Sequence, residues 1–503
     1  MNRHQTLEAG AAAQELSPML LAVLANRFDG VVREMTNTML RTGRSAVINS
    51  ARDFSCGITT GDNELFATAE GLPAHTYGLN LQTAAMCRFH DDIAEGDAYL
   101  HNDPYSGNSH PADHTLIVPV FWEGEHLFNV CAKAHQADIG NSLPSTYHAA
   151  ARDLYEEGAL IFPAVRVQRA HRTNMDIIRM CQRRIRVPDY WYGDFLSMLG
   201  AARTGEKRIH DIFRKYGKAT IRRFVGQWFD YSESRMRQAI AALPAATIER
   251  ESFHDPIPPF RDESIPVRVK ITVEPEAGVV ELDLTANIDC MDNGLNLSEA
   301  CAISNSVAGI YNSLPADIPR NGGSYRCIRM KLREGAAIGI PRFPHSCSVA
   351  TTNVSERLLN NVQAALAGRD DETLVLNRTG AQQRLPMRLA GLVGERRRHT
   401  QQLGTALRQT AIQLGKAQVV THRQTQRADI GGHHDVGGLT RRDGARLAIL
   451  IDAITTVDID IEQMNLVVAR NAPAAGAVDQ RCSVDARIVA GHPHRHGAGD
   501  DGE

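Results

Sequence analysis

The chain has 503 residues, of which 43% are hydrophobic and 22% charged, a composition typical of a soluble globular protein with room for about two to four domains. Its 55 Lys and Arg nearly balance its 58 Asp and Glu, and the formal charge of -3 argues against a dedicated nucleic-acid binder. The early apolar run at 19–25 is far shorter than the roughly 20 residues that span a membrane, and no secretory signal precedes it. We therefore expect a cytoplasmic protein that binds neither a membrane nor a nucleic acid, and nine Cys without a C-x-x-C pair indicate reduced thiols.

The first strong pattern along the chain is an amphipathic helix. Ser17 and Pro18 are typical of an N-cap and a first helical position, and apolar residues then recur every three or four positions as far as Gly43. Short strands and turns are expected over 46–69. Two β-rich runs, 115–122 and 126–132, flank Glu123-Gly124-Glu125, which predicts a hairpin with a three-residue connection.

Further elements follow in the next 130 residues. Residues 174–216 have a helical pattern that Pro188 interrupts. Apolar and polar residues alternate at 266–273 and 279–285 around a turn sequence, which predicts a second hairpin, and another helix is expected at 297–312. Together these patterns predict an α+β fold, with a mixed, β-hairpin-rich core and long amphipathic helices.

The composition changes sharply near the end of this region. All 28 aromatic residues lie at or before Phe343, although about 13 would be expected in the remaining 160 positions at the earlier rate. The same stretch has 18 Arg but a single Lys. We therefore predict an N-terminal extension at 1–16, a catalytic region at 17–366 and a separate aromatic-free tail, rich in Arg, Gln, Ala and Gly, at 367–503.

The strongest chemical pattern is His110-x-x-Asp113 followed by His135-x-x-Asp138. If Gly124 is the centre of the hairpin, paired residues have numbers that sum to 248, and Asp113 lies opposite His135 with Cβ atoms ~4.5–5.5 Å apart. His110 lies three residues before Asp113, so two imidazoles and one carboxylate could bind one divalent ion, with Zn, Mn or Fe(II) as candidates. Asp138 would be an extra ligand or a hydrogen-bond partner of the ligands.

Two alternatives stay open for this pattern. Ordinary hydrogen-bonded polar residues at a strand end would look the same, and Pro119 inside the first strand is typical of a bulge that would change the register. His75 and His114 are candidates for a supporting role or for a general base, although such a histidine is more often a hydrogen-bonded structural residue. The segment around Gly200 and Gly205 approaches a phosphate loop, but its Lys is misplaced and no Ser or Thr follows, so we reject a nucleotide site there.

Two segments carry a family resemblance. Residues 102–115 read Asn-Asp-Pro-Tyr-Ser-Gly-Asn-Ser-His-Pro-Ala-Asp-His-Thr, and residues 134–140 read Ala-His-Gln-Ala-Asp-Ile-Gly. They resemble the two signature motifs of the hydantoinase B/oxoprolinase family, which also includes the large subunits of acetone and acetophenone carboxylases. Supporting matches occur in order at 52–56, 73–75, 156–158, 317–323 and 341–344.

The resemblance implies a function and a set of partners. His110, Asp113 and His135 would be the metal ligands of a B-type subunit, and Asp53 would be a weaker fourth candidate. A separate hydantoinase A-like ATPase subunit would carry ATP and Mg²⁺ and phosphorylate the amide oxygen of a hydantoin or lactam. The metal on this chain would then activate the water that opens the ring, which makes the heteromer a hydrolase of cyclic amide C–N bonds.

Alternatives to this function also follow from the resemblance. The chain could be the α subunit of an ATP-dependent ketone carboxylase, or a catalytically inactive subunit that binds the partner. Family members continue past 366 with a glycine-rich, aromatic-containing region, which we cannot match after about residue 368. We therefore hypothesise that the catalytic region is truncated relative to the family, and that the tail is an out-of-frame reading of a GC-rich gene or a diverged, loosely packed segment.

Overall fold

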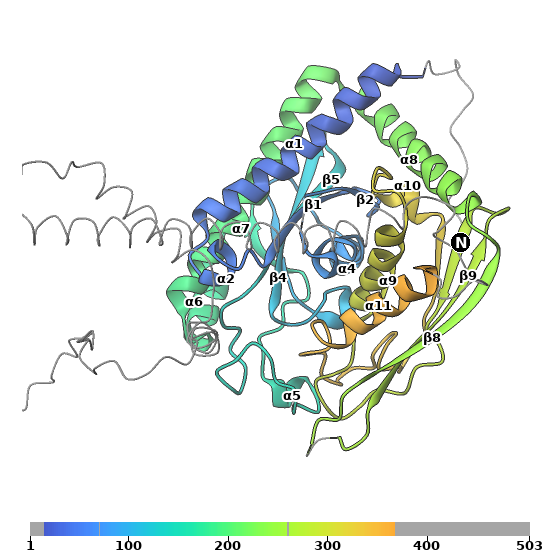
Figure 1. Cartoon of the computed structure of the whole chain (residues 1–503). Helices are drawn as coiled ribbons and strands as arrows, with labels where there is room; N and C mark the ends of the chain where they lie inside the picture. Colours follow the sequence, from blue (N-terminus) through green and yellow to red (C-terminus); the bar gives the residue numbers. More distant parts are fainter. Residues whose placement is uncertain (1–14, 70, 259–260, 368–503) are drawn as a thin grey trace, which may run out of the picture. The chain divides into compact units, whose positions relative to one another are not determined.

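A computed structural model describes residues 15–69, 71–258 and 261–367. The chain divides into the units Met1–Leu403 and Gly404–Glu503, and all described residues lie in the first. The tail predicted at 367–503 lies outside the described residues except for Ala367, and so does the extension predicted at 1–16 except for its last two residues. Within the described part, helices and two separate sheets confirm the expected α+β class (Figure 1).

Helix α1 (Pro18–Thr42) confirms the first predicted element. The side-chain oxygen of Ser17 accepts a hydrogen bond from the Leu20 amide, Pro18 occupies the first turn, and the helix ends before Gly43. Its buried stripe includes Phe28 and Met35 and faces the larger sheet. Figure 1 shows α1 running beside α7 (Pro188–Tyr216), and these two helices cover the same face of that sheet.

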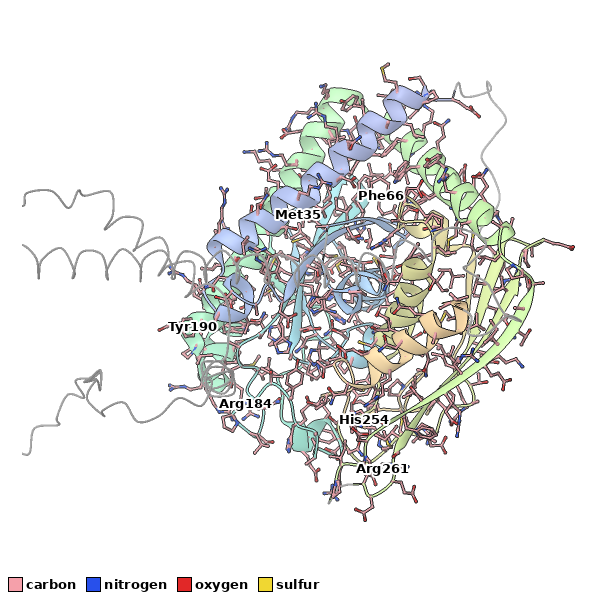
Figure 2. All side chains as sticks on the ribbon, viewed as in Figure 1. Met35, Phe66, Arg184, Tyr190, His254 and Arg261 are labelled. Carbon is pink, nitrogen blue, oxygen red and sulfur yellow. The ribbon has the colours of Figure 1, made fainter. Side chains whose placement is uncertain are left out.

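The larger sheet has the strand order β2-β1-β5-β4-β3-β6-β7 among the described residues. Its strands are β1 (Phe54–Thr60), β2 (Leu65–Thr68), β3 (Ala98–His101), β4 (Asp113–Trp122), β5 (Glu125–His135), β6 (Val165–Arg169) and β7 (Arg172–Thr173). Side chains on the α1 and α7 face form one hydrophobic core, in which Met35 and Phe66 are buried (Figure 2). The central strands β4 and β5 are therefore covered by helices on this side.

The β4–β5 hairpin has the predicted register but a different turn. Trp122 pairs with Glu125, so the loop is the two residues Glu123 and Gly124, both with positive φ, and not the three residues expected. A bulge between Val120 and Phe121 adds the residue that the shorter loop removes. From Val120 back to Asp113, the numbers of each two paired residues sum to 248, as predicted. The bulge therefore begins one residue after Pro119, the residue at which it was expected.

The opposite face of the sheet packs against short helices and a second core. These helices are α3 (Pro73–Thr76), α4 (Leu79–Phe89) and α9 (Glu299–Ser313), the last confirming the helix expected at 297–312. A smaller sheet of order β11-β10-β9-β8 completes this core together with α11 (Val354–Ala367). Its strands are β8 (Ala246–His254), β9 (Ile265–Glu274), β10 (Val279–Asp283) and β11 (Ile328–Lys331), and β9–β10 is the second predicted hairpin.

The helical pattern at 174–216 forms α6 (Met175–Arg184) and α7, separated before Pro188 as predicted. Helix α8 (Lys218–Ala241) follows α7 directly after Gly217 and was not predicted from the pattern. The remaining elements are α2 (Ala46–Asn49), the 3₁₀ turn Pro104–Ser106, α5 (Leu154–Glu157) and α10 (Gly322–Tyr325). Among the helices described, none combines the length and the apolar character that crossing a membrane requires.

Candidate metal centre

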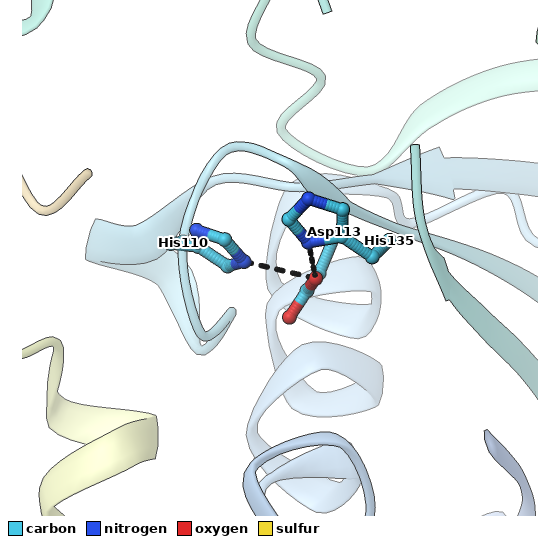
Figure 3. Close-up of side chains that lie close together, drawn as sticks. All are labelled: His110, Asp113 and His135. Carbon is cyan, nitrogen blue, oxygen red and sulfur yellow. Dashed lines mark hydrogen bonds and ion pairs between the residues drawn. The ribbon is translucent and has the colours of Figure 1, made fainter. Parts of the chain in front are cut away.

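The ends of β4 and β5 bring three predicted ligands together. Asp113 begins β4 directly opposite His135, the last residue of β5, and His110 lies in the turn that leads into β4. His110 Nε2 is 2.9 Å and His135 Nδ1 is 3.1 Å from the same atom, Asp113 Oδ1 (Figure 3). All three side chains are buried, and their ligand atoms lie within 4.8 Å of one another.

The outer nitrogens of both imidazoles are held by hydrogen bonds. His110 Nδ1 donates to the carbonyl oxygen of Ser348 at 3.0 Å, and His135 Nε2 lies 3.0 Å from the hydroxyl of Thr146. A carbonyl can only accept, so Nδ1 of His110 carries the proton and Nε2 of the neutral ring offers a lone pair. Such outer hydrogen bonds orient the histidines of metal sites and set their tautomers.

The inner atoms fit a cation. In a neutral His110 ring, the lone pair of Nε2 would face a carboxylate oxygen of Asp113 at 2.9 Å, and two acceptors repel each other at that distance unless a proton or a metal lies between them. His135 approaches the same oxygen from a second direction. Two imidazoles and one carboxylate suit Zn, Mn or Fe(II), so His110, Asp113 and His135 could hold such an ion.

The second oxygen of Asp113 faces further polar groups. Asp113 Oδ2 lies 3.0 Å from His75 Nε2 and 3.9 Å from Lys133 Nζ, and it accepts a hydrogen bond from Ser109 Oγ. Burial alone would raise the pKa of Asp113, but the charges of His110 and His75 and the hydrogen bonds hold that pKa well below its usual range. The carboxylate is therefore ionised when it is available to a metal.

Burial acts in the same direction on two neighbouring basic groups, but the net shifts of their pKa values are opposite. It would lower the pKa of His110, but the charge and hydrogen bond of Asp113 outweigh it and raise that pKa. For Lys133, burial dominates and lowers the pKa, although Asp113 opposes the shift. The centre is thus a buried cluster of one carboxylate among several basic side chains.

Asp53 lies at the edge of this cluster. Its Oδ1 is 3.6 Å from His75 Nε2, and its main-chain carbonyl accepts a hydrogen bond from the amide of His135. His75 links it to the centre, because the same nitrogen approaches Asp113. The side chain of Asp53 is 31% exposed, whereas that of Asp113 is 2% exposed. Asp53 therefore lies near the proposed ligands without being one of the three converging groups.

Asp138 and His114 lie elsewhere. The carboxylate of Asp138 binds Arg186 at 2.8 Å and accepts from the Gly140 amide, so these contacts stabilise a loop and do not support a place among the ligands. His114 follows Asp113 in a strand and points to the opposite face, where its Nδ1 accepts from Trp191 Nε1. Burial lowers its pKa to about 3. His114 thus belongs to the packing of α7, which differs from the expected supporting role.

Several residues of the centre were not predicted. The ring of Tyr147 stacks on His110 with ring centroids 5.6 Å apart and also contacts His135. Ser348 and Thr146 orient the imidazoles, and Lys133 approaches Asp113 from the same face of β5 as His135. Strand alternation could have identified Lys133, two residues before His135, whereas the other three come from loops without a regular pattern.

The buried carboxyl of Glu157 supports the segment that carries Ser348. Its Oε2 accepts a hydrogen bond from Ser346 Oγ at 2.8 Å, and burial raises its pKa. Ser348 Oγ in turn accepts from the amide of His148, next to Tyr147. The loops at 142–158 and 346–348 therefore hold each other over the imidazoles.

Comparisons of sequence and fold show which known proteins this chain resembles. The Hydantoinase B/oxoprolinase family model matches residues 17–435. The caprolactamase subunit beta of Pseudomonas jessenii is 28% identical over 366 residues, which cover 70% of this chain and 60% of that subunit. The crystal structure of the ATP-dependent caprolactamase from Pseudomonas jessenii matches with a TM-score of 0.66 at 26% identity, over 70% of this chain and 60% of that chain.

Two other relatives extend the comparison. 5-Oxoprolinase 1 of Arabidopsis thaliana is 24% identical over 345 residues, covering 63% of this chain and 26% of that protein. The nucleotide-free structure of acetone carboxylase matches with a TM-score of 0.64 at 18% identity, over 70% of this chain and 47% of that one, which is a likeness of fold. The chain thus spans less than two thirds of the length of each of these proteins.

Proposed function

Because the chain belongs to the hydantoinase B/oxoprolinase family, we propose that it is the metal-bearing subunit of an ATP-dependent hydrolase that opens a cyclic amide, such as a hydantoin or a lactam. The observation that carries the proposal is the convergence of His110 and His135 on one oxygen of Asp113. Relatives described as an ATP-dependent caprolactamase and as a 5-oxoprolinase support cyclic amides as the substrate class.

A divalent ion bound by His110, Asp113 and His135 would supply a Lewis acid that polarises a substrate oxygen and acidifies water. The protein residues have separate tasks around it. The Ser348 carbonyl and the Thr146 hydroxyl keep the inner nitrogens of the two imidazoles aimed at Asp113. Tyr147 stacks on the ring of His110 and contacts that of His135, which helps to fix their orientation.

The partner in this proposal is an A-type ATPase subunit. The name of the caprolactamase subunit beta supports a heteromer, because a beta subunit has a partner. In the proposed cycle the partner transfers the terminal phosphoryl group of ATP to the amide oxygen. One water adds to the activated carbon, the C–N bond breaks as the ring nitrogen takes up a proton, and a second water releases phosphate from the resulting acyl phosphate. The net reaction converts one cyclic amide, one ATP and two waters into the ring-opened acid, ADP and phosphate; the acid is an amino acid from a lactam and an N-carbamoyl amino acid from a hydantoin.

The test is ATP turnover by this chain co-expressed with an A-type partner. Hydantoins, lactams and ketones are supplied in turn, each with and without bicarbonate, and bound metal is counted by plasma mass spectrometry. We expect lactam- or hydantoin-stimulated turnover that is indifferent to bicarbonate and is lost in His135→Ala together with the metal. Asp138→Ala is the matched control, because its carboxylate binds Arg186 and should leave metal content unchanged.

Other outcomes would replace the proposal. Ketone-stimulated turnover that requires bicarbonate would assign the chain to the carboxylases, whose fold it shares. A stable complex without turnover and without metal would assign it to the inactive partner-binding class.

A further inference from the structure

A row of buried polar residues crosses the larger sheet beside the candidate metal centre. The strand pairing places Lys133 of β5 opposite Thr115 of β4, and Thr115 opposite His101 of β3. Residues paired in this way point to the same face of a sheet. Asp113 lies two residues before Thr115 in β4, and His135 lies two residues after Lys133 in β5. Because alternate residues of a strand point to the same face, both share the face of the row. The three residues of the row, His101, Thr115 and Lys133, are each at most 1% exposed.

Helix α4 lies over this face. Its buried positions 79, 82, 83 and 86 follow helical spacing, and Leu79 and Met86 pack in the same core as Tyr99 and Ile117, the next apolar row of the sheet. Gln82 lies between these two anchors and is fully buried. We call His101, Thr115, Lys133 and Gln82 the donor cluster.

The donor cluster is poorly satisfied by the protein. Among the described residues, neither Thr115 Oγ1 nor either amide atom of Gln82 has a hydrogen-bond partner. The Nζ of Lys133 reaches the Ala74 carbonyl only at 3.5 Å and Asp113 Oδ2 at 3.9 Å. Buried polar atoms in native proteins are nearly always paired, so unpaired atoms in the row beside Asp113 and His135, and on the helix that packs in the core on this face, indicate a missing partner.

His101 adds a further donor to the cluster. Its Nδ1 accepts from the amide of Ala164 at 3.1 Å, so the proton of the neutral ring is on Nε2. Burial lowers the pKa of His101 to about 3. The charge of Lys133 also lowers this pKa, and the Ser106 carbonyl opposes the shift. The ring is therefore neutral near pH 7. The Ser106 carbonyl lies near Nε2, but the contact falls short of hydrogen-bond geometry, so this N–H is weakly satisfied.

The available groups are mainly donors: the Nζ of a lysine, a hydroxyl, an imidazole N–H and an amide NH₂. An oxyanion is the ligand that matches them, because its oxygens accept several hydrogen bonds at once. We propose that the donor cluster is an oxyanion subsite that receives a carboxylate or phosphoryl group beside the metal ligands. This inference rests on the proposed function, in which a phosphorylated amide is consumed and a carboxylate is produced.

The test is direct anion binding, measured without ATP on the full-length, metal-loaded chain. Isothermal titration calorimetry with inorganic phosphate and, separately, with acetate distinguishes a phosphoryl from a carboxylate site. We expect saturable binding of at least one anion. Thr115→Val keeps the side-chain shape but removes the hydroxyl, and it should weaken that binding by about tenfold or more, as expected for a lost hydrogen bond to a charged group. Thr115→Ser should restore it.

The matched control is Thr59→Val. Thr59 is a buried threonine on β1 of the same sheet, but its hydroxyl donates to Thr83 and accepts from Asn129, so this variant should bind the anion as the wild type does. The proposal is overturned if the wild type binds neither anion, or if Thr115→Val binds as tightly as the wild type. Because binding is measured without turnover, a wrong proposed function would leave this result intact, and a failed subsite would leave turnover intact.

Discussion

Replacing Asp113 by Asn tests the candidate metal centre most directly. Asp113 is buried, and its carboxylate lies within ion-pair distance of four basic side chains: His75, His110, His135 and Lys133. Removing one member of a buried ionic cluster leaves its partners uncompensated and typically costs about 3–5 kcal/mol. We therefore expect Asp113→Asn to lower the unfolding free energy of the metal-free chain by that amount and to abolish metal binding.

Asp138→Asn is the comparison for this variant. Its partner Arg186 has a side chain that is 40% exposed and can be hydrated when the ion pair is lost, so the expected cost is about 1 kcal/mol or less. Urea unfolding of both variants in EDTA, with metal content measured separately, makes the comparison. Asp113 is not a metal ligand in a buried ionic cluster if Asp113→Asn retains stoichiometric metal, or if this variant is as stable as Asp138→Asn.

Three further predictions concern packing, pH and metal removal. In α7, Gly200→Ala should raise the melting temperature, because nothing lies within 4 Å of the new Cβ and the helix gains about 1 kcal/mol. Gly205→Ala should lower it, because its Cβ would lie 2.6 Å from Met35 Sδ and 2.7 Å from Val130 Cγ1, and overpacking costs about 1–3 kcal/mol. A melting temperature above the wild type for Gly205→Ala would contradict this packing. Because His101 has its pKa lowered from 6.5 to about 3, the folded chain binds fewer protons than the unfolded chain between these values. Its unfolding free energy should therefore fall as pH drops below about 6.5, by up to about 1.4 kcal/mol per pH unit. In His101→Gln, the unfolding free energy measured in urea should depend less steeply on pH, by the amount that corresponds to the uptake of one proton on unfolding. An unchanged pH dependence would exclude this contribution of His101. EDTA should destabilise the metal-loaded wild type by about 2.7 kcal/mol if the ion was present at a hundred times its Kd, and should leave His135→Ala unaffected in the same melting assay.

The local elements and the pairing of Asp113 with His135 could be predicted from the sequence. Periodicity identified α1, the break before α7 and both hairpins, because helices and strands impose spacings of 3.6 and 2 residues on buried side chains. The hairpin turn was predicted one residue too long, yet the register held because the bulge at Val120 offsets the shorter loop. Local sequence could not reveal that compensation, since the bulge depends on the packing of the whole strand pair.

The rest of the candidate site depends on tertiary contacts. His110 is oriented by Ser348, which is 238 residues away in sequence, and Tyr147 reaches both imidazoles from an irregular loop. Whether a histidine belongs to the centre or to the core was also decided by the fold: His75 reaches Asp113 from α3, whereas His114 packs under α7. The sequence by itself determined which residues could bind a metal and which strand positions pair, because those follow from side-chain chemistry and backbone periodicity. Only the tertiary structure decided which groups surround Asp113, because burial and long-range packing set the partners and the charge of each buried side chain.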